Sequence, residues 1–145
     1  MKTTDNIYAL ITGASKGLGK SYAIELAKRN HNVLLLSCEN EGLPELCKTI
    51  QHDYGVKANY FETDLTDLNE IDRLVKWVND KYSINILINN AGLGGSCQFD
   101  KSSLSFIDDM VKVNIRAPAM LTHQFLPMLK QHGEAYILNV SSMAS

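Results

Sequence analysis

The chain has 145 residues, of which 45% are hydrophobic and 21% are charged, and its formal net charge is −2 at pH 7. This composition is that of an ordinary soluble globular protein, and the length supports one hydrophobic core, so we expect a single domain over residues 1–145. The slightly negative charge gives no electrostatic reason to expect nucleic acid as a partner, and no apolar run is long enough to predict a membrane span.

The first predicted strand, 7–11, runs directly into Thr-Gly-Ala-Ser-Lys-Gly-Leu-Gly at 12–19. A buried strand, a glycine-rich turn and then a helix form the geometry that places a pyrophosphate on a helix N-terminus. We expect Gly13 to permit the tight turn, Gly17 to let the backbone approach the phosphates, and Gly19 to allow close helix packing.

Helices and strands alternate along the rest of the chain. The apolar patterns predict strands over 33–36, 57–62, 84–88 and 135–140, and helices over 20–30, 43–54, 67–82 and 103–131. Pro44 suits the first helical position of the second helix, Asp67 is expected to cap the third helix with Leu68 inside, and Pro118 should bend or break the last one. The alternation predicts an α/β fold, a Rossmann-type doubly wound parallel sheet whose ligand crevice lies at the carboxyl ends of the strands.

The cysteines and the N-terminal residues indicate the cellular compartment in which the protein is expected. Cys38, Cys47 and Cys97 are odd in number and lack metal-ligand spacing, so we expect plain thiols, no metal site and a reducing cytoplasm. Residues 1–6 are polar and lead straight into the first strand, which does not resemble a signal peptide.

Five segments together carry a family resemblance: 12–19, 64–65, 89–92, Asn114 and 141–142. At these spacings they resemble the classical short-chain dehydrogenase/reductase family over the whole chain. The segment 19–29 is similar to the branch of 3-oxoacyl and 17β-hydroxysteroid reductases.

The resemblance implies a site for NAD(P)(H). The residues that would hold the pyrophosphate and adenosine ribose are Gly13, Ser15, Lys16, Gly17, Leu18 and Gly19. Asp64 would accept a hydrogen bond from the adenine amino group, with Leu65 beside the ring. Asn90, Ala91 and Gly92 would pass close to the cofactor. A plain turn is the alternative for the glycine-rich segment, and a helix-capping or solvated carboxylate is the alternative for Asp64.

The resemblance also implies two residues at the reacting centre. Asn114 would brace the active site and hold a water for proton relay, and Ser142, rather than its neighbour Ser141, would hydrogen-bond the substrate oxygen. A purely structural role, satisfying backbone groups near Pro118, is the alternative for Asn114.

The end of the second strand should select the nicotinamide cofactor, because an acid there favours a free 2′-hydroxyl and a base favours a 2′-phosphate. In the family register Ser37 stands where NAD-selecting members have Asp, and Cys38 stands where NADP-selecting members often have Arg. Lys16 could pair with the 2′-phosphate, whereas Glu39 could repel it or bind a hydroxyl. The pattern favours NADP(H) over NAD(H).

In this family a Tyr, with a Lys four residues later, protonates the developing alkoxide. None of the six tyrosines here has that spacing, and the chain is expected to be the cofactor-binding portion of a reductase, truncated after the fifth strand and inactive alone. The full-length parent would reduce a carbonyl or oxidise an alcohol and form a homo-oligomer. Two alternatives remain: a non-catalytic dinucleotide-binding module, and a P-loop NTPase in which Lys20 and Ser21 complete a relaxed phosphate-binding motif.

Overall fold

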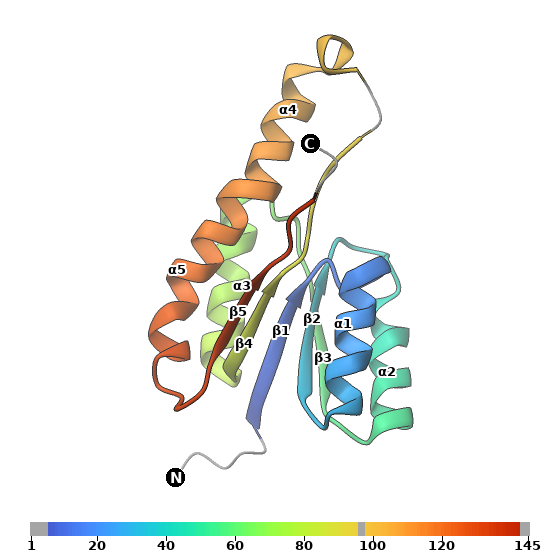
Figure 1. The fold of residues 1–145 in the computed structure, drawn as a ribbon, viewed down its shortest axis with the longest axis vertical. Coiled ribbons are helices and arrows are strands. Elements are labelled where there is room, and N and C mark those ends of the chain that lie inside the picture. The colour runs from blue at the N-terminus through green and yellow to red at the C-terminus, as the bar shows by residue number, and fades with distance from the viewer. Residues whose placement is uncertain (1–5, 96–97, 143–145) are drawn as a thin grey trace.

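The computed structural model describes residues 6–95 and 98–142, and its centre is a five-stranded parallel sheet (Figure 1). The strands are β1 Ile7–Thr12, β2 Asn32–Ser37, β3 Ala58–Glu62, β4 Ser83–Asn89 and β5 Tyr136–Asn139. Their spatial order is β3-β2-β1-β4-β5, with every neighbouring pair parallel. The predicted Rossmann-type doubly wound fold is confirmed.

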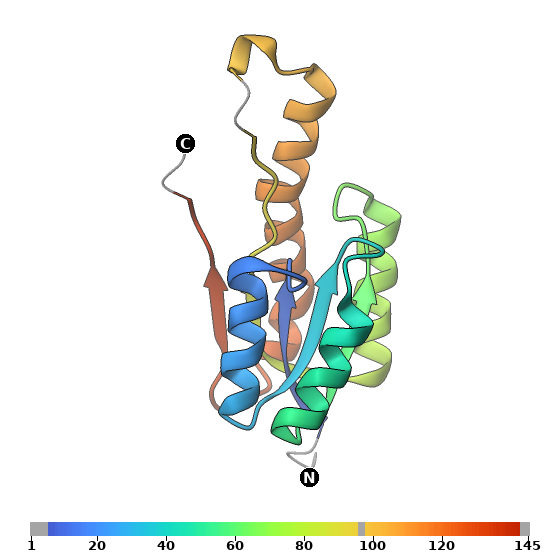
Figure 2. The same cartoon turned by 90° about the vertical axis from the view of Figure 1, so that its right-hand side faces the viewer.

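Helices cover both faces of this sheet. They are α1 Gly17–Lys28, α2 Leu43–Tyr54, α3 Leu68–Lys81, α4 Leu104–Val111 and α5 Ala117–Leu129. In Figures 1 and 2, α1 and α2 lie on one face and α3 and α5 on the other, while α4 extends beyond the carboxyl ends of the strands. A short 3-10 turn, Phe99–Lys101, precedes α4.

The sheet separates two hydrophobic clusters, because successive side chains of a strand point to opposite faces. Tyr8 and Leu10 of β1 belong to the cluster beneath α3 and α5, which also contains Phe125. Ala9 and Ile11 belong to the cluster beneath α1 and α2. Each central strand is therefore apolar on both faces, as its continuous apolar run indicated.

The starts of α2 and α3 agree with the sequence prediction, but the predicted burial of Leu68 is wrong. Pro44 lies in the first turn of α2, and the Asp67 side chain caps α3 by accepting a hydrogen bond from the Asn69 N–H at 2.8 Å. Leu68 was expected inside but is 45% exposed. It is the first residue of α3, whose buried stripe begins at Ile71.

The long last helix is interrupted earlier than expected. A π-helical segment, Lys112–Arg116, joins α4 to α5, and Pro118 lies in the first turn of α5 rather than at the break itself. Proline has no N–H to donate to the carbonyl four residues back, here that of Asn114, and its ring crowds that carbonyl. The wider turn before Pro118 accommodates both effects.

Within the part of the chain that the structure describes, β5 lies at the sheet edge and pairs with β4 alone, and all four of its residues are exposed. Tyr136 retains 59% of its surface and Leu138 retains 40%. Within the described residues, no helix combines the length and apolarity needed to cross a membrane.

Candidate functional site

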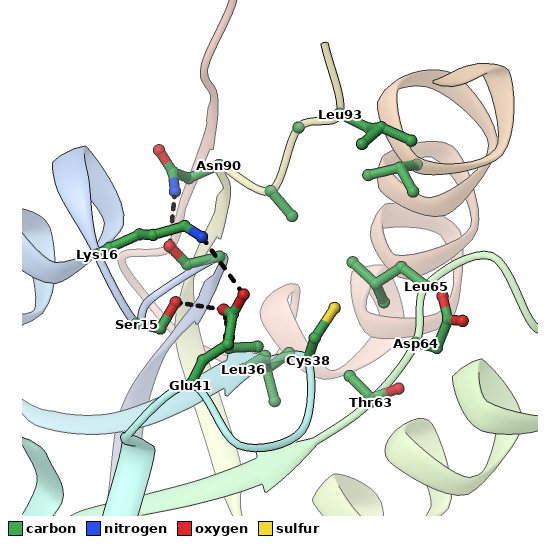
Figure 3. Close-up of a pocket in the computed structure, with 15 residues that line it drawn as sticks. Ser15, Lys16, Leu36, Cys38, Glu41, Thr63, Asp64, Leu65, Asn90 and Leu93 are labelled. Atoms are coloured by element: carbon green, nitrogen blue, oxygen red, sulfur yellow. Dashed lines mark hydrogen bonds and ion pairs between the residues drawn. The ribbon is translucent and has the colours of Figure 1, made fainter. Parts of the chain in front are cut away.

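A cavity of about 390 Å³ opens at the carboxyl ends of β1 to β4 (Figure 3). Its lining comes from segments far apart in sequence: Gly13, Ser15, Lys16, Leu36, Ser37, Cys38, Glu41, Thr63, Asp64, Leu65, Asn90, Ala91, Gly92, Leu93 and Val113. The predicted residues of the loops after β1, β2, β3 and β4 are thus brought together. Gly17, Leu18 and Gly19 open α1 beside the cavity.

The three glycines after β1 differ in their surroundings. Gly13 has a φ of +64°, and a Cβ on Gly19 would lie 2.1 Å from the Gly13 carbonyl oxygen, so turn and helix pack without room for a side chain. Gly17 has a φ of +55°, yet a Cβ there would meet nothing within 4 Å. The backbone at Gly17 is therefore left open to an incoming group.

The N-terminus of α1 lies at this open backbone. Lys16 occupies the N-cap position with extended backbone, no side chain of the described residues caps the helix, and its first turn contains no acid. The first N–H groups of a helix lack internal partners and carry partial positive charge, which favours an anion. Leu18 in the same turn is 60% exposed. This end of α1 can bind phosphate oxygens through its backbone.

Thr12, at the end of β1, holds the loop after β4 in place. Its buried hydroxyl oxygen accepts hydrogen bonds from the N–H groups of Asn90, at 3.0 Å, and Ala91, at 2.8 Å. The Asn90 side-chain amide donates to the Thr12 and Gly13 carbonyls at 3.0 and 3.2 Å. Since a Cβ on Gly13 would lie 2.9 Å from the Ala91 Cα, the two loops form one rigid floor.

The segment after β3 forms another wall. Asp64 is exposed at the cavity, and its Oδ1 accepts a hydrogen bond from the Thr66 N–H two residues further along the chain, at 2.8 Å. Leu65 is buried and apolar beside it. Thr63 also lines the cavity, and its buried hydroxyl has no hydrogen-bond partner among the described residues.

A carboxylate absent from the sequence predictions lies in the cavity wall after β2. Glu41 accepts hydrogen bonds from the hydroxyls of Ser15, at 2.5 Å, and Ser37, and its Oε1 lies 3.4 Å from the Lys16 ammonium (Figure 3). The Ser15 and Ser37 hydrogen bonds lower the pKa of Glu41, and the Lys16 contact adds to this effect. Glu39, which the sequence suggested for this position, does not line the cavity.

Cys38, in the same wall, is an exposed free thiol whose pKa is raised first by burial of part of its surface and then by Glu41 and Asp64. The described residues contain no cluster of three or more His, Cys, Asp or Glu side chains that could hold a metal ion. Cys97 lies outside the described residues.

Asn114 lies in the π segment and fixes the far rim of the site. Its side-chain oxygen accepts from the Leu93 N–H and its amide donates to the Leu93 carbonyl, both at 2.8 Å. Arg116, on the same segment, donates to the Thr66 carbonyl at 2.5 Å. Asn114 thus satisfies backbone groups of Leu93, and the π segment braces the loops after β3 and β4 together.

A second cavity, of about 440 Å³, lies beside β4 and β5 and is lined by Asn89, Ala91, Asn114, Ile115, Pro118, Ala119, Thr122, Asn139 and Val140. The Asn89 amide donates to Thr122 and to Asn139, but its buried oxygen has no partner among the described residues. Ser142 is exposed two residues beyond this lining.

Comparison with known proteins places this geometry in a family. The family model described as short chain dehydrogenase matches residues 8–145. The chain belongs to the short-chain dehydrogenase/reductase family. This membership excludes the P-loop NTPase alternative.

Two curated relatives match the expected branch. Hydroxysteroid dehydrogenase-like protein 1 of Gallus gallus is 34% identical over 93% of this chain and 41% of its own length. The very-long-chain 3-oxoacyl-CoA reductase of Anas platyrhynchos is 32% identical over 94% of this chain and 45% of its own. The chain therefore spans less than half the length of these relatives.

A solved short-chain dehydrogenase from Sphingobium yanoikuyae, in complex with NADPH, superposes with a TM-score of 0.87 at 30% identity. The match covers 94% of this chain and 53% of the other. The cavity fits the adenosine and pyrophosphate of such a cofactor, because Gly17 leaves open space at a helix N-terminus and the lining includes the buried Thr63 hydroxyl, which has no hydrogen-bond partner among the described residues.

Proposed function

We propose that this chain is the cofactor-binding portion of an NADP(H)-dependent reductase that acts on a carbonyl or alcohol. The observation that carries the proposal is the 390 Å³ cavity at the carboxyl ends of four parallel strands, bounded by the uncapped N-terminus of α1. The bound nicotinamide cofactor would supply or accept the hydride.

The residues of the chain would divide the binding between them. The backbone at Gly17 and the first turn of α1 would hold the pyrophosphate, and Gly13, Ser15, Leu18 and Gly19 would shape that loop. The ribose would lie against Lys16, Ser37 and Cys38, and the adenine between Asp64 and Leu65. Asn90, Ala91 and Gly92 would leave room for the rest of the cofactor.

The preference for NADP(H) rests on Lys16. Its ammonium group is largely exposed, with 83% of the side chain accessible, and stands at the ribose end of the cavity where a 2′-phosphate would lie. A lysine binds phosphate as a point charge. The structural relative from Sphingobium yanoikuyae holds NADPH, which supports the same choice.

Two residues would face the substrate. Ser142 would hydrogen-bond the substrate oxygen from beyond β5, and Asn114 would hold the rim at Leu93 while bracing the reacting centre. A proton donor with the Tyr-x-x-x-Lys spacing is not among the 145 residues. We therefore expect these residues to bind the cofactor without turnover, and we expect a full-length reductase of this type to assemble as a homo-oligomer.

The proposal is tested by titrating the purified chain with NADPH while following nicotinamide fluorescence. Saturable binding that 2′,5′-ADP displaces and that Mg-ATP leaves unchanged is the expected result. The absence of any saturable dinucleotide binding would refute the cofactor assignment. Ketone-dependent oxidation of NADPH by the 145-residue chain would instead refute the expectation of binding without turnover.

The second candidate is a dinucleotide-binding module without catalysis, which would use the same cavity and the same uncapped N-terminus of α1. Kinetics of the native gene product distinguish the two: ketone reduction supports the reductase, and tight binding with no reduction of any carbonyl supports the module.

A further inference from the structure

Glu41 lies in a short loop after β2 whose backbone conformation is fixed by the residues on either side of it. Asn40, with a φ of +61°, and Gly42, with a φ of +81°, flank it in left-handed backbone conformations. The Asn40 N–H donates to the Glu62 carboxylate of β3 at 3.1 Å, which ties the loop to the sheet. The carboxylate of Glu41 is thereby turned toward the cavity.

The three partners of Glu41 are all donors. Ser37 is a buried residue at the end of β2, and Ser15 belongs to the glycine loop. Lys16 supplies the only positive charge among the described residues that line the cavity. Two hydroxyl groups and an ammonium group are also the donors that a phosphate group on the ribose would need. In the structure they are engaged by a carboxylate of this chain.

The net charge of the cavity lining also disfavours a 2′-phosphate. One lysine stands against two carboxylates, Glu41 and Asp64, so the cavity is acidic although Lys16 suggests a phosphate site. A 2′-phosphate carries about −1.5 to −2 charges near neutral pH. It would have to displace Glu41 from Lys16 or lie beside it with mutual repulsion. A 2′-hydroxyl, in contrast, can donate a hydrogen bond to the Glu41 carboxylate.

We propose that Glu41 is a specificity-determining residue beside the 2′-phosphate position, where it weakens the preference for NADP(H) that Lys16 provides and assists NAD(H) binding. This proposal rests on the proposed function, since it concerns the same cavity. Lys16 and Glu41 act in opposite directions there, and the cofactor preference is set by their competition. The residue lies four positions beyond Ser37, outside the position at which the sequence suggested that an acid would select NAD.

The experiment compares Glu41→Gln with the unmodified protein by fluorescence titration of the full chain with NADPH and with NADH. Removal of one like charge beside the phosphate should tighten NADPH binding roughly tenfold relative to NADH. The matched control is Glu39→Gln, which removes the same charge two residues away at an exposed position outside the cavity lining. It should change the ratio of the two dissociation constants less than about twofold.

Each outcome decides between the claims. A NADPH/NADH affinity ratio that is the same in Glu41→Gln and in the unmodified protein would overturn the Glu41 proposal while leaving cofactor binding intact. An equal change of the NADPH/NADH affinity ratio in Glu39→Gln and in Glu41→Gln would also overturn the proposal, because a long-range effect of net charge would then explain both results. Failure of the unmodified protein to bind either dinucleotide would refute the proposed function instead.

Titration with 2′,5′-ADP and 5′-AMP supplies a measurement independent of the nicotinamide. The 2′,5′-ADP should bind Glu41→Gln more tightly than the unmodified protein, whereas 5′-AMP should not gain affinity. Thermal unfolding of each variant without ligand verifies that the comparison is made on folded protein. A gain in affinity for both nucleotides alike would count against a role at the 2′-position.

Discussion

Replacing Gly19 with alanine would place a methyl carbon 2.1 Å from the Gly13 carbonyl oxygen and 2.5 Å from the Asn90 side-chain amide. The first of these atoms belongs to the backbone, so the turn and α1 would have to separate. Overpacking typically costs about 1–3 kcal/mol, and a backbone clash this severe should lie at or above the upper end. We expect Gly19→Ala to lower the melting temperature by about 10 °C, at roughly 3 °C per kcal/mol for a domain of this size.

Gly17→Ala is the matched control, because a Cβ there meets nothing within 4 Å. Its φ of +55° lies in the left-handed region, where a side chain costs roughly 1–2 kcal/mol. The melting temperature should therefore fall by only about 3–6 °C. The added methyl group lies at the open backbone of α1, where phosphates are proposed to bind, so NADPH affinity should fall at least about tenfold.

The assay is thermal unfolding followed by circular dichroism, with and without NADPH, for the parent chain and both variants. Gly17→Ala should keep most of its stability and lose the NADPH-dependent rise in melting temperature. If Gly17→Ala proves as unstable as Gly19→Ala, or keeps the full NADPH-dependent rise, the division of roles between the two glycines is wrong.

Three further results are expected. Asp67→Ala should lower the free energy of unfolding in urea by about 1 kcal/mol through loss of the α3 cap, whereas the exposed Asp72→Ala should change it by less than about 0.5 kcal/mol. Thr12→Val should cost about 1–3 kcal/mol in the same assay because two loop N–H groups lose their acceptor, and Thr12→Ser, which keeps the hydroxyl, should recover most of that loss. Burial raises the pKa of Cys47 to about 12, so its thiol stays protonated from pH 7 to 10. Mass-spectrometric mapping should therefore find Cys47 unalkylated in the native protein over this pH range. Rapid alkylation of Cys47 in the native protein would contradict its burial.

The sequence predicted the sheet well because its signals are local. Continuous apolar runs such as 33–36 and the glycine spacing at 13–19 depend on near neighbours in the chain, and both appear in the structure at the expected elements. The loops after β1 to β4 also meet as predicted, because parallel strands place their carboxyl ends at one edge.

Glu41 was missed because its position depends on backbone geometry that composition does not reveal. Two left-handed residues, Asn40 and Gly42, turn it toward Ser15, which is 26 positions away in the chain. A Gly after an Asn-Glu pair is a signal that a turn occurs there, but it does not say which side chain the turn directs inward.

The π segment escaped prediction for a related reason. The sequence of residues 112–116 is compatible with an α-helix, whose hydrogen bonds span four residues, and with a π-helix, whose hydrogen bonds span five. Pro118 indicated only that the helix is irregular nearby. The roles of Asn114 and Ser142 toward a substrate stay predictions.

The position of β1 in the middle of the sheet has a consequence for hydrogen exchange. The glycine loop and Thr12 extend from the strand that is paired on both sides and buried on both faces, so opening this part of the molecule requires nearly global unfolding. The amides of the exposed edge strand β5 can exchange through local fraying. The side of the cavity at which we propose that the ribose and pyrophosphate bind is thus built on amides that should exchange slowly, and the proposed substrate side is built beside amides that should exchange faster.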